Sequence, residues 1–200
     1  MMQAGKVNVA IAFRIFGIFL IFFYTVQCTQ APEAKLGIKK NAHIVLIGNN
    51  LGSRMMNFGH FETEMHVRYP DSLLFIRNMC DGGNTPGFRP HASRVSPWAF
   101  PGAEKFQTEL ANYSDSQGHF ETEDQWLTRL QADIIIAFFG YNGSFQGEER
   151  LQNYKNELDA FIKYTLSQKY NAKSPPQLII VSPIAFEDLS AKFDLPNGQR

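Results

Sequence analysis

The run Ile44-Val45-Leu46-Ile47-Gly48 decides the fold class of this 200-residue chain. It is short, continuously apolar and ends in glycine, which is typical of a strand buried in a parallel sheet. Similar runs predict strands at 72–77, 133–140 and 177–184, and helical patterns lie between them at 53–68, 124–130 and 148–170. This alternation predicts an α/β fold, a three-layer sandwich with a central parallel sheet.

Residues that directly follow these strands are the first candidates for a site, because ligands of such sheets bind outside the carboxyl ends of the strands. Gly48-Asn49-Asn50-Leu51 follows the first strand and Gly82-Gly83-Asn84-Thr85 the second. Gly140-Tyr141-Asn142-Gly143 follows the third. Glycine and asparagine are also ordinary turn residues, but their recurrence at successive strand ends is more specific and indicates a site.

In this order the three blocks resemble the SGNH, or GDSL-type, hydrolase superfamily over about 42–200. The resemblance implies a flavodoxin-like fold and hydrolysis of acetyl or acyl esters by a serine of the first block. It also implies that the Gly83 backbone and the Asn142 side chain donate hydrogen bonds in the oxyanion hole. The stretches 58–63 and 138–142 are similar to a bacterial subfamily attached to large exported multi-domain proteins.

Two departures from the superfamily pattern concern the catalytic residues. Asn50 stands where the serine is usual, and an amide cannot form an acyl-enzyme because its nitrogen is delocalised. No Asp-x-x-His block follows the last predicted strand; either the chain ends before this block or the base is lost, and the incomplete α/β pattern favours a fragment. Ser53, about one helical turn past Asn50, is an alternative nucleophile, although a first-turn helix serine is commoner.

We therefore expect an exported hydrolase-like domain with impaired or lost catalysis. The alternative is a non-catalytic module of a larger protein with further domains downstream, which binds a small-molecule ester or a carbohydrate. Tyr141 is expected either to line the pocket or to pack in the core. In the long irregular stretch 84–118, Arg89 is expected to meet an acidic substrate or partner, or to lie on a solvated loop. Trp98 either stacks on a sugar or pins this loop to the domain.

Composition and motifs argue against other classes of protein. The 19 basic residues are balanced by 19 acidic ones, whereas a nucleic-acid binder needs a basic face. No phosphate-binding glycine loop and no haem-attachment motif occurs, so no cofactor is expected. His60, Glu62, Glu64 and His66 lack the HExxH order and are expected on a solvated face, without a metal ion.

Residues 1–27 are expected to form an export signal. Lys6 and Arg14 precede the apolar run 15–26, whose 12 residues are fewer than the roughly 20 of a membrane-spanning helix. A signal-anchor is the alternative, because 7–13 is also fairly apolar. The sequence therefore predicts a periplasmic, extracellular or membrane-anchored domain, with the membrane met only through this signal or a lipid.

Cys28 resembles the lipidated cysteine of bacterial lipoproteins, although Gln27 stands where a small residue is usual. Ordinary cleavage without lipidation is the alternative. Residues 28–41 lack periodicity and are expected to be a tether to the domain at 42–200. A removed or lipidated Cys28 leaves Cys80 without a partner, so no internal disulfide is expected.

Overall fold

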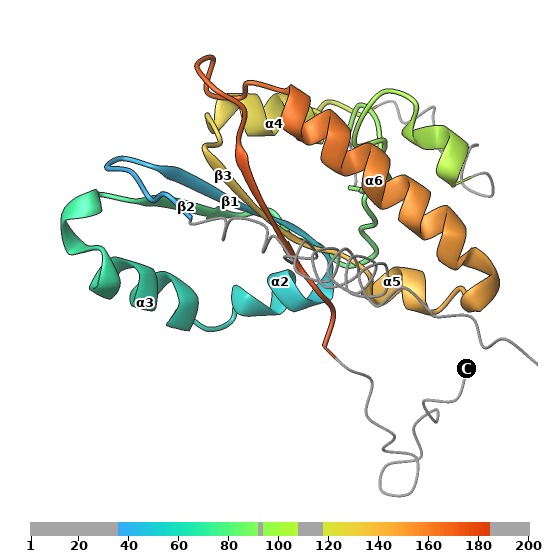
Figure 1. The fold of residues 1–200 in the computed structure, drawn as a ribbon, viewed down its shortest axis with the longest axis horizontal. Coiled ribbons are helices and arrows are strands. Elements are labelled where there is room, and N and C mark those ends of the chain that lie inside the picture. Colours follow the sequence, from blue (N-terminus) through green and yellow to red (C-terminus); the bar gives the residue numbers. More distant parts are fainter. Residues whose placement is uncertain (1–35, 92–93, 108–117, 185–200) are drawn as a thin grey trace, which may run out of the picture. The chain divides into compact units, whose positions relative to one another are not determined.

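A computed structural model describes residues 36–91, 94–107 and 118–184. Its four strands form one parallel sheet in the order β2-β1-β3-β4 (Figure 1). The strands are β1 (His43–Gly48), β2 (Phe75–Asn78), β3 (Ile134–Phe138) and β4 (Gln177–Val181). The α/β class and the central parallel sheet predicted from the sequence are thereby confirmed.

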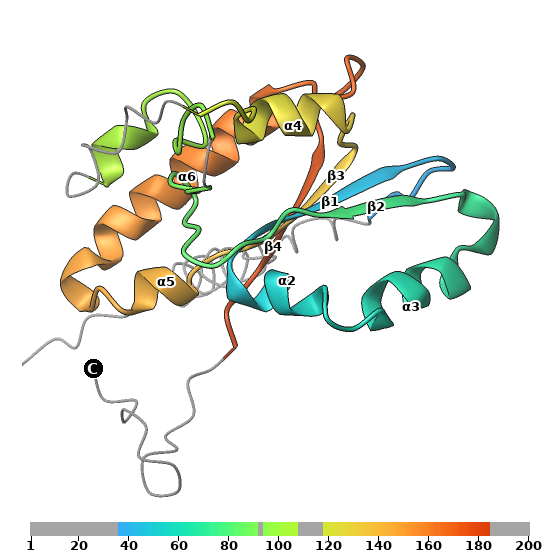
Figure 2. The same cartoon turned by 180° about the vertical axis from the view of Figure 1, so that it is seen from behind.

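Helices cover both faces of this sheet (Figures 1 and 2). One face carries α2 (Asn50–Met55) and α3 (His60–Arg68), and the other carries α4 (Glu123–Arg129) and α6 (Leu151–Ser167). A four-residue helix, α5 (Tyr141–Ser144), follows β3. All these elements belong to the compact unit that begins at Gly37.

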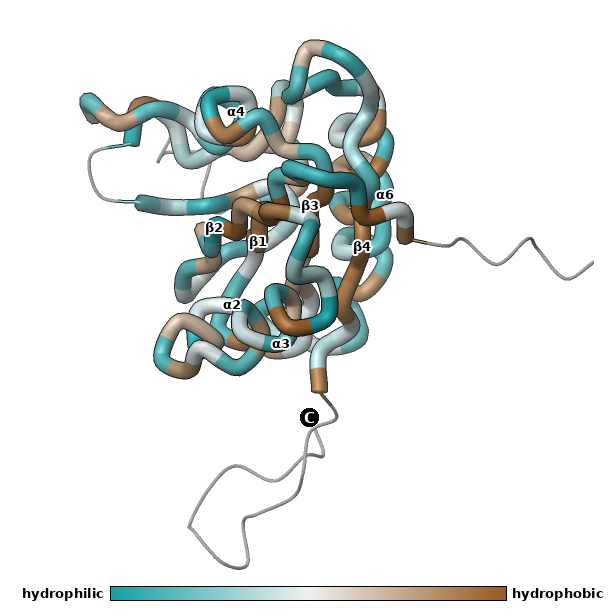
Figure 3. The backbone as a smooth tube through the Cα atoms, turned by 90° about the vertical axis from the view of Figure 1, so that its left-hand side faces the viewer, coloured by the Kyte–Doolittle hydropathy of each residue, from teal (hydrophilic) through white to brown (hydrophobic). Residues whose placement is uncertain are grey.

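The central strands are continuously apolar because both of their faces are buried. All five residues of β3 are buried, and successive side chains point to opposite faces. Ile135 packs in the core that contains Phe161 of α6, whereas Ile136 packs in the core next to Phe61 of α3. Figure 3 shows the hydrophobic colour concentrated along β1, β3 and β4.

Two predicted elements differ from the structure. The helix predicted at 53–68 is two helices, since α2 ends at Met55 and α3 begins only at His60. The strand predicted from 72 begins at Phe75, because a 3-10 turn occupies Pro70–Ser72 and Leu73 has the left-handed φ of 47°. Both differences arise at chain reversals that hydrophobic periodicity does not reveal.

The N-terminal predictions fall largely outside the described residues. This holds for the signal at 1–27, for Cys28 and for most of the tether. Within the described residues, no helix is long and apolar enough to cross a membrane. The end of the predicted tether joins the folded unit, because Gly37 exchanges two hydrogen bonds of 3.0 Å with the Gln177 side chain.

The long stretch after β2 is fastened to α6 by one buried carboxylate, that of Glu157, which is only 1% exposed. Its Oε1 accepts hydrogen bonds from Thr85 Oγ1 (2.6 Å) and from the Gly87 backbone (2.8 Å). Gln107 Nε2 lies 3.3 Å from both carboxylate oxygens. Glu157 thereby holds both ends of the stretch 85–107 and fixes the chain that follows Gly82 and Gly83.

We predict that Glu157→Ala lowers the free energy of unfolding by about 2–4 kcal/mol, because it leaves the buried N–H of Gly87 and the half-buried hydroxyl of Thr85 without this acceptor. Urea denaturation followed by circular dichroism measures the change. Asp159→Ala is the matched control: Asp159 lies on the same helix, is exposed and pairs with the exposed Lys163. Its expected effect is within about 0.5 kcal/mol, and equal effects of the two variants would contradict the role given to Glu157.

Candidate functional site

The carboxyl ends of β1 and β3 meet at the middle of the sheet. The chain leaves β1 toward β2 and leaves β3 toward β4 on the other side, which is the arrangement that opens a crevice in parallel α/β sheets. Gly48 makes the close approach possible: its φ is 123°, and a Cβ at this position would lie 2.3 Å from the Phe138 carbonyl oxygen. Any other residue would force the two strands apart.

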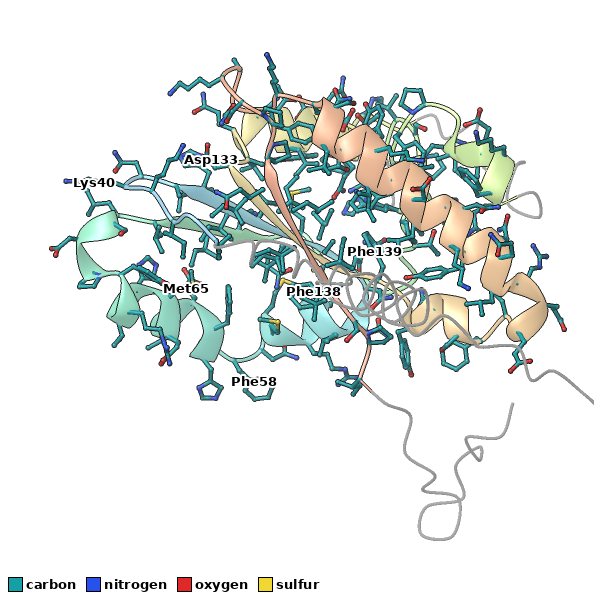
Figure 4. All side chains as sticks on the ribbon, viewed as in Figure 1. Lys40, Phe58, Met65, Asp133, Phe138 and Phe139 are labelled. Atoms are coloured by element: carbon teal, nitrogen blue, oxygen red, sulfur yellow. The ribbon has the colours of Figure 1, made fainter. Side chains whose placement is uncertain are left out.

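A cavity of about 240 Å³ lies at this edge, between the ends of β1, β3 and β4. Its wall is mostly apolar and comprises Leu51, Phe138, Phe139, Val181, Pro183 and Ile184. Its polar lining residues are Asn49, Asn50, Arg54, Tyr141 and Ser182. Figure 4 shows Phe138 on the side of α2 and Phe139 on the side of α6.

The first two sequence blocks come together at the end of β1. A Cβ added to Gly82 would lie 3.1 Å from Asn50 Oδ1, so this side chain reaches the second block. The Gly48 carbonyl accepts hydrogen bonds from the Asp81 backbone (2.9 Å) and from Asn84 Nδ2 (2.8 Å). The expectation that residues at neighbouring strand ends share one location therefore holds for these two blocks.

The third block reaches the cavity through Tyr141. Its ring is 37% exposed and packs edge-on against Phe145, with centroids 5.0 Å apart. Asn142, the second residue of α5, is half-buried and is not among the lining residues, and neither is Gly83. Gly83 has the left-handed φ of 83° that its turn requires. Of the two expected oxyanion donors, neither lines this cavity, whereas Asn50 and Tyr141 do.

Arg89 lies neither on a solvated loop nor at the cavity, in contrast to both expectations from the sequence. It is 1% exposed, and its Nη1 lies 3.1 Å from Glu123 Oε1. The guanidinium also lies over the rings of Phe139 and Phe161, about 5 Å from each centroid. A cation held by a buried carboxylate and two ring faces stabilises the interior; it is not available to a ligand.

Trp98 packs against the same core and supports the anchoring alternative over sugar stacking. Its ring meets Phe88 edge-on at 5.2 Å, and the two residues form an isolated β-bridge. Trp98 is not among the residues that line the cavity. The pairing of Phe88 with Trp98 therefore holds this part of the long loop against the domain.

The lining residues carry no group that can act as a general base. Neither a histidine nor a carboxylate is among the described residues that line the cavity. Ser182 brings a hydroxyl, but an unassisted serine is a weak nucleophile. Ser53 lies inside α2, after the capping residue Asn49, and does not line the cavity. The part of the chain that the structure describes also holds no cluster of three or more metal-binding side chains.

Two residues of α2 matter for the cavity and were not singled out in the sequence. Gly52 is buried, and a Cβ there would lie 2.3 Å from Cys80 Sγ and 2.9 Å from the Phe138 ring, so only glycine lets α2 lie this close to the sheet. Burial raises the pKa of Cys80 to about 12, and its thiol packs as an apolar group.

Arg54, the second of these residues, lines the cavity. It is one helical turn after Asn50, a spacing that could have indicated that both side chains lie on one face of the helix.

No family model, no curated protein and no solved structure matches the chain. The resemblance to SGNH hydrolases is a prediction from the three sequence blocks, and these comparisons do not test it. Since one fold serves many activities, the function has to be argued from the cavity's own residues.

We predict that Gly52→Ala lowers stability by about 1–3 kcal/mol, because the added methyl group overpacks the contact between α2 and the sheet. Cys80→Ala in the same chain should restore part of this loss by removing the closest atom. Thermal unfolding of both single variants and the double variant measures the coupling, expected at about 1 kcal/mol or more. Strictly additive effects would show that Cys80 is not the obstacle.

Proposed function

We propose that the chain is an exported domain of the SGNH-hydrolase type that binds a ligand at the cavity and does not hydrolyse it. The lining of the cavity carries this proposal. Asn50 occupies the nucleophile position, and neither imidazole nor carboxylate is among the described lining residues. What remains is a set of hydrogen-bonding amides and apolar walls, which suits binding.

The order of the sheet supports the SGNH type. The first and third blocks follow the two central strands, β1 and β3, and the second block is tied back to the Gly48 carbonyl. The Asn50 side chain also reaches Gly82, so the first two blocks lie next to each other at the end of β1.

The loss of hydrolysis follows from the chemistry of the groups present. Acyl transfer by serine needs a base within hydrogen-bond reach to take its proton. All five histidines of the sequence, at positions 43, 60, 66, 91 and 119, lie outside the cavity lining. The Asn50 amide can instead donate and accept hydrogen bonds to a bound carbonyl or carboxylate.

We expect the full chain, its Ser53→Ala variant and its Ser182→Ala variant to hydrolyse p-nitrophenyl acetate at rates within about twofold of one another. Neither hydroxyl has a base that could activate it. Ser144→Ala is the control, since Ser144 lies on α5 outside this cavity. The rates are measured from the absorbance of the p-nitrophenolate that is released. A tenfold or larger drop, roughly 1.4 kcal/mol, in either variant but not in the control would overturn the proposal.

Export is the second part of the proposal and rests on 1–27. Fused to residues 1–41, an alkaline phosphatase reporter, whose disulfides form only outside the cytoplasm, should be active in a bacterial host. Phe19→Arg should abolish that activity, because a charge in the apolar run blocks membrane insertion. Lipidation is tested by growing cells with radioactive palmitate: a lipidated Cys28 labels the unaltered protein, and Cys28→Ala should then carry no label. An inactive unaltered fusion would contradict export.

A further inference from the structure

Arg54 is the charged residue among the described residues that line the cavity. It lies on α2, one turn after Asn50, and its side chain is exposed. Within the described residues, no carboxylate lies within 4 Å of its guanidinium, in contrast to Arg68 of α3, which pairs with Glu64. Among the described residues, this cation of the cavity lining therefore has no carboxylate partner, and a bound anion can supply one.

A buried amide in the same lining also lacks a partner among the described residues. Asn49 lines the cavity and is only 2% exposed. Its Nδ2 has no hydrogen-bond acceptor among the residues that the structure describes, although buried polar groups are nearly always paired. An unpaired buried N–H costs about 1–3 kcal/mol, so an acceptor brought by a ligand would offset this cost. Asn50 places a second side-chain amide at the same end of the cavity.

The remaining wall is apolar and limits the size of the ligand. Phe138, Val181 and Ile184 are among the apolar residues that line the space. The cavity volume is about 240 Å³, and a cavity of roughly 150 Å³ is enough to hold benzene. By that ratio the space holds roughly eight to ten non-hydrogen atoms.

We propose that the ligand of this cavity is a small monocarboxylate with an apolar tail of about five carbons, the size that the volume allows. Its carboxylate pairs with the Arg54 guanidinium, whose planar fork matches two carboxylate oxygens, and accepts hydrogen bonds from the amides of Asn49 and Asn50. Its tail lies against the apolar wall. This inference rests on the proposed binding function of the same cavity and names the chemical class that it selects.

The test compares hexanoate with hexanamide, which has the same shape and no charge. Titration of the full, ¹⁵N-labelled chain, followed by NMR, should shift the side-chain amide signals of Asn49 and Asn50 with hexanoate. Hexanamide should bind about tenfold more weakly, because it lacks the charge-assisted hydrogen bonds. Arg54→Gln should weaken hexanoate binding about tenfold and leave hexanamide binding unchanged. Arg54→Lys should retain part of the affinity, since lysine keeps the charge but loses the fork.

Arg68→Gln is the matched control, because it removes the same charge from an exposed residue of α3 that does not line the cavity. Equal binding of hexanoate and hexanamide, insensitive to Arg54→Gln, would overturn the carboxylate assignment and leave the binding function in place. Absence of any amide shift at about 10 mM hexanoate, where ligands of this size bind, would also overturn it. The proposed loss of hydrolysis is judged separately by p-nitrophenyl acetate, whose outcome does not depend on Arg54.

Discussion

The contact between Gly48 and the Phe138 carbonyl fixes the distance between the two central strands at their carboxyl ends. The same short region gathers the rest of the site. The Asn49 backbone donates to the Phe138 carbonyl at 2.9 Å, and the Gly48 carbonyl accepts from Asp81 and Asn84. The start of α2, the loop after β2 and the end of β3 are thus tied to one pair of peptide groups. A side chain at position 48 would disturb all three at once.

The two faces of the sheet are stabilised differently. The core beneath α2 and α3 is built from aliphatic and aromatic side chains together with Cys80. The opposite face also buries charge: Glu123 pairs with Arg89, and Glu157 binds the loop. Buried charges are costly unless they are paired and hydrogen-bonded, so these groups hold the irregular stretch in one arrangement. The cavity at the carboxyl edge lies next to both kinds of core, through Phe138 and Phe139.

The central strands were predictable because burial on both faces removes polar residues from most of β1 and from all of β3, and such runs are visible without any tertiary knowledge. Asn50 and Tyr141 could be predicted because they follow β1 and β3, and ligands of parallel sheets bind outside the carboxyl ends of the strands. Arg89 was misplaced because its partner, Glu123, belongs to another element, and no local pattern pairs them. Gly83 and Asn142 lie outside the cavity lining, whereas Arg54 belongs to it. These placements depend on the directions that the backbone and side chains take at turns, which spacing alone does not determine.

Glu157 has a further consequence for the order in which the domain assembles. Its bonds to Thr85 and Gln107 span 72 and 50 residues of sequence, and contacts this distant pay their loop-closure entropy before they are formed. During synthesis, the stretch that begins beside Gly82 and Gly83 remains unfastened until the whole of α6 has left the ribosome. The carboxyl edge of the sheet is therefore completed only after β1, β2 and β3 are available for pairing.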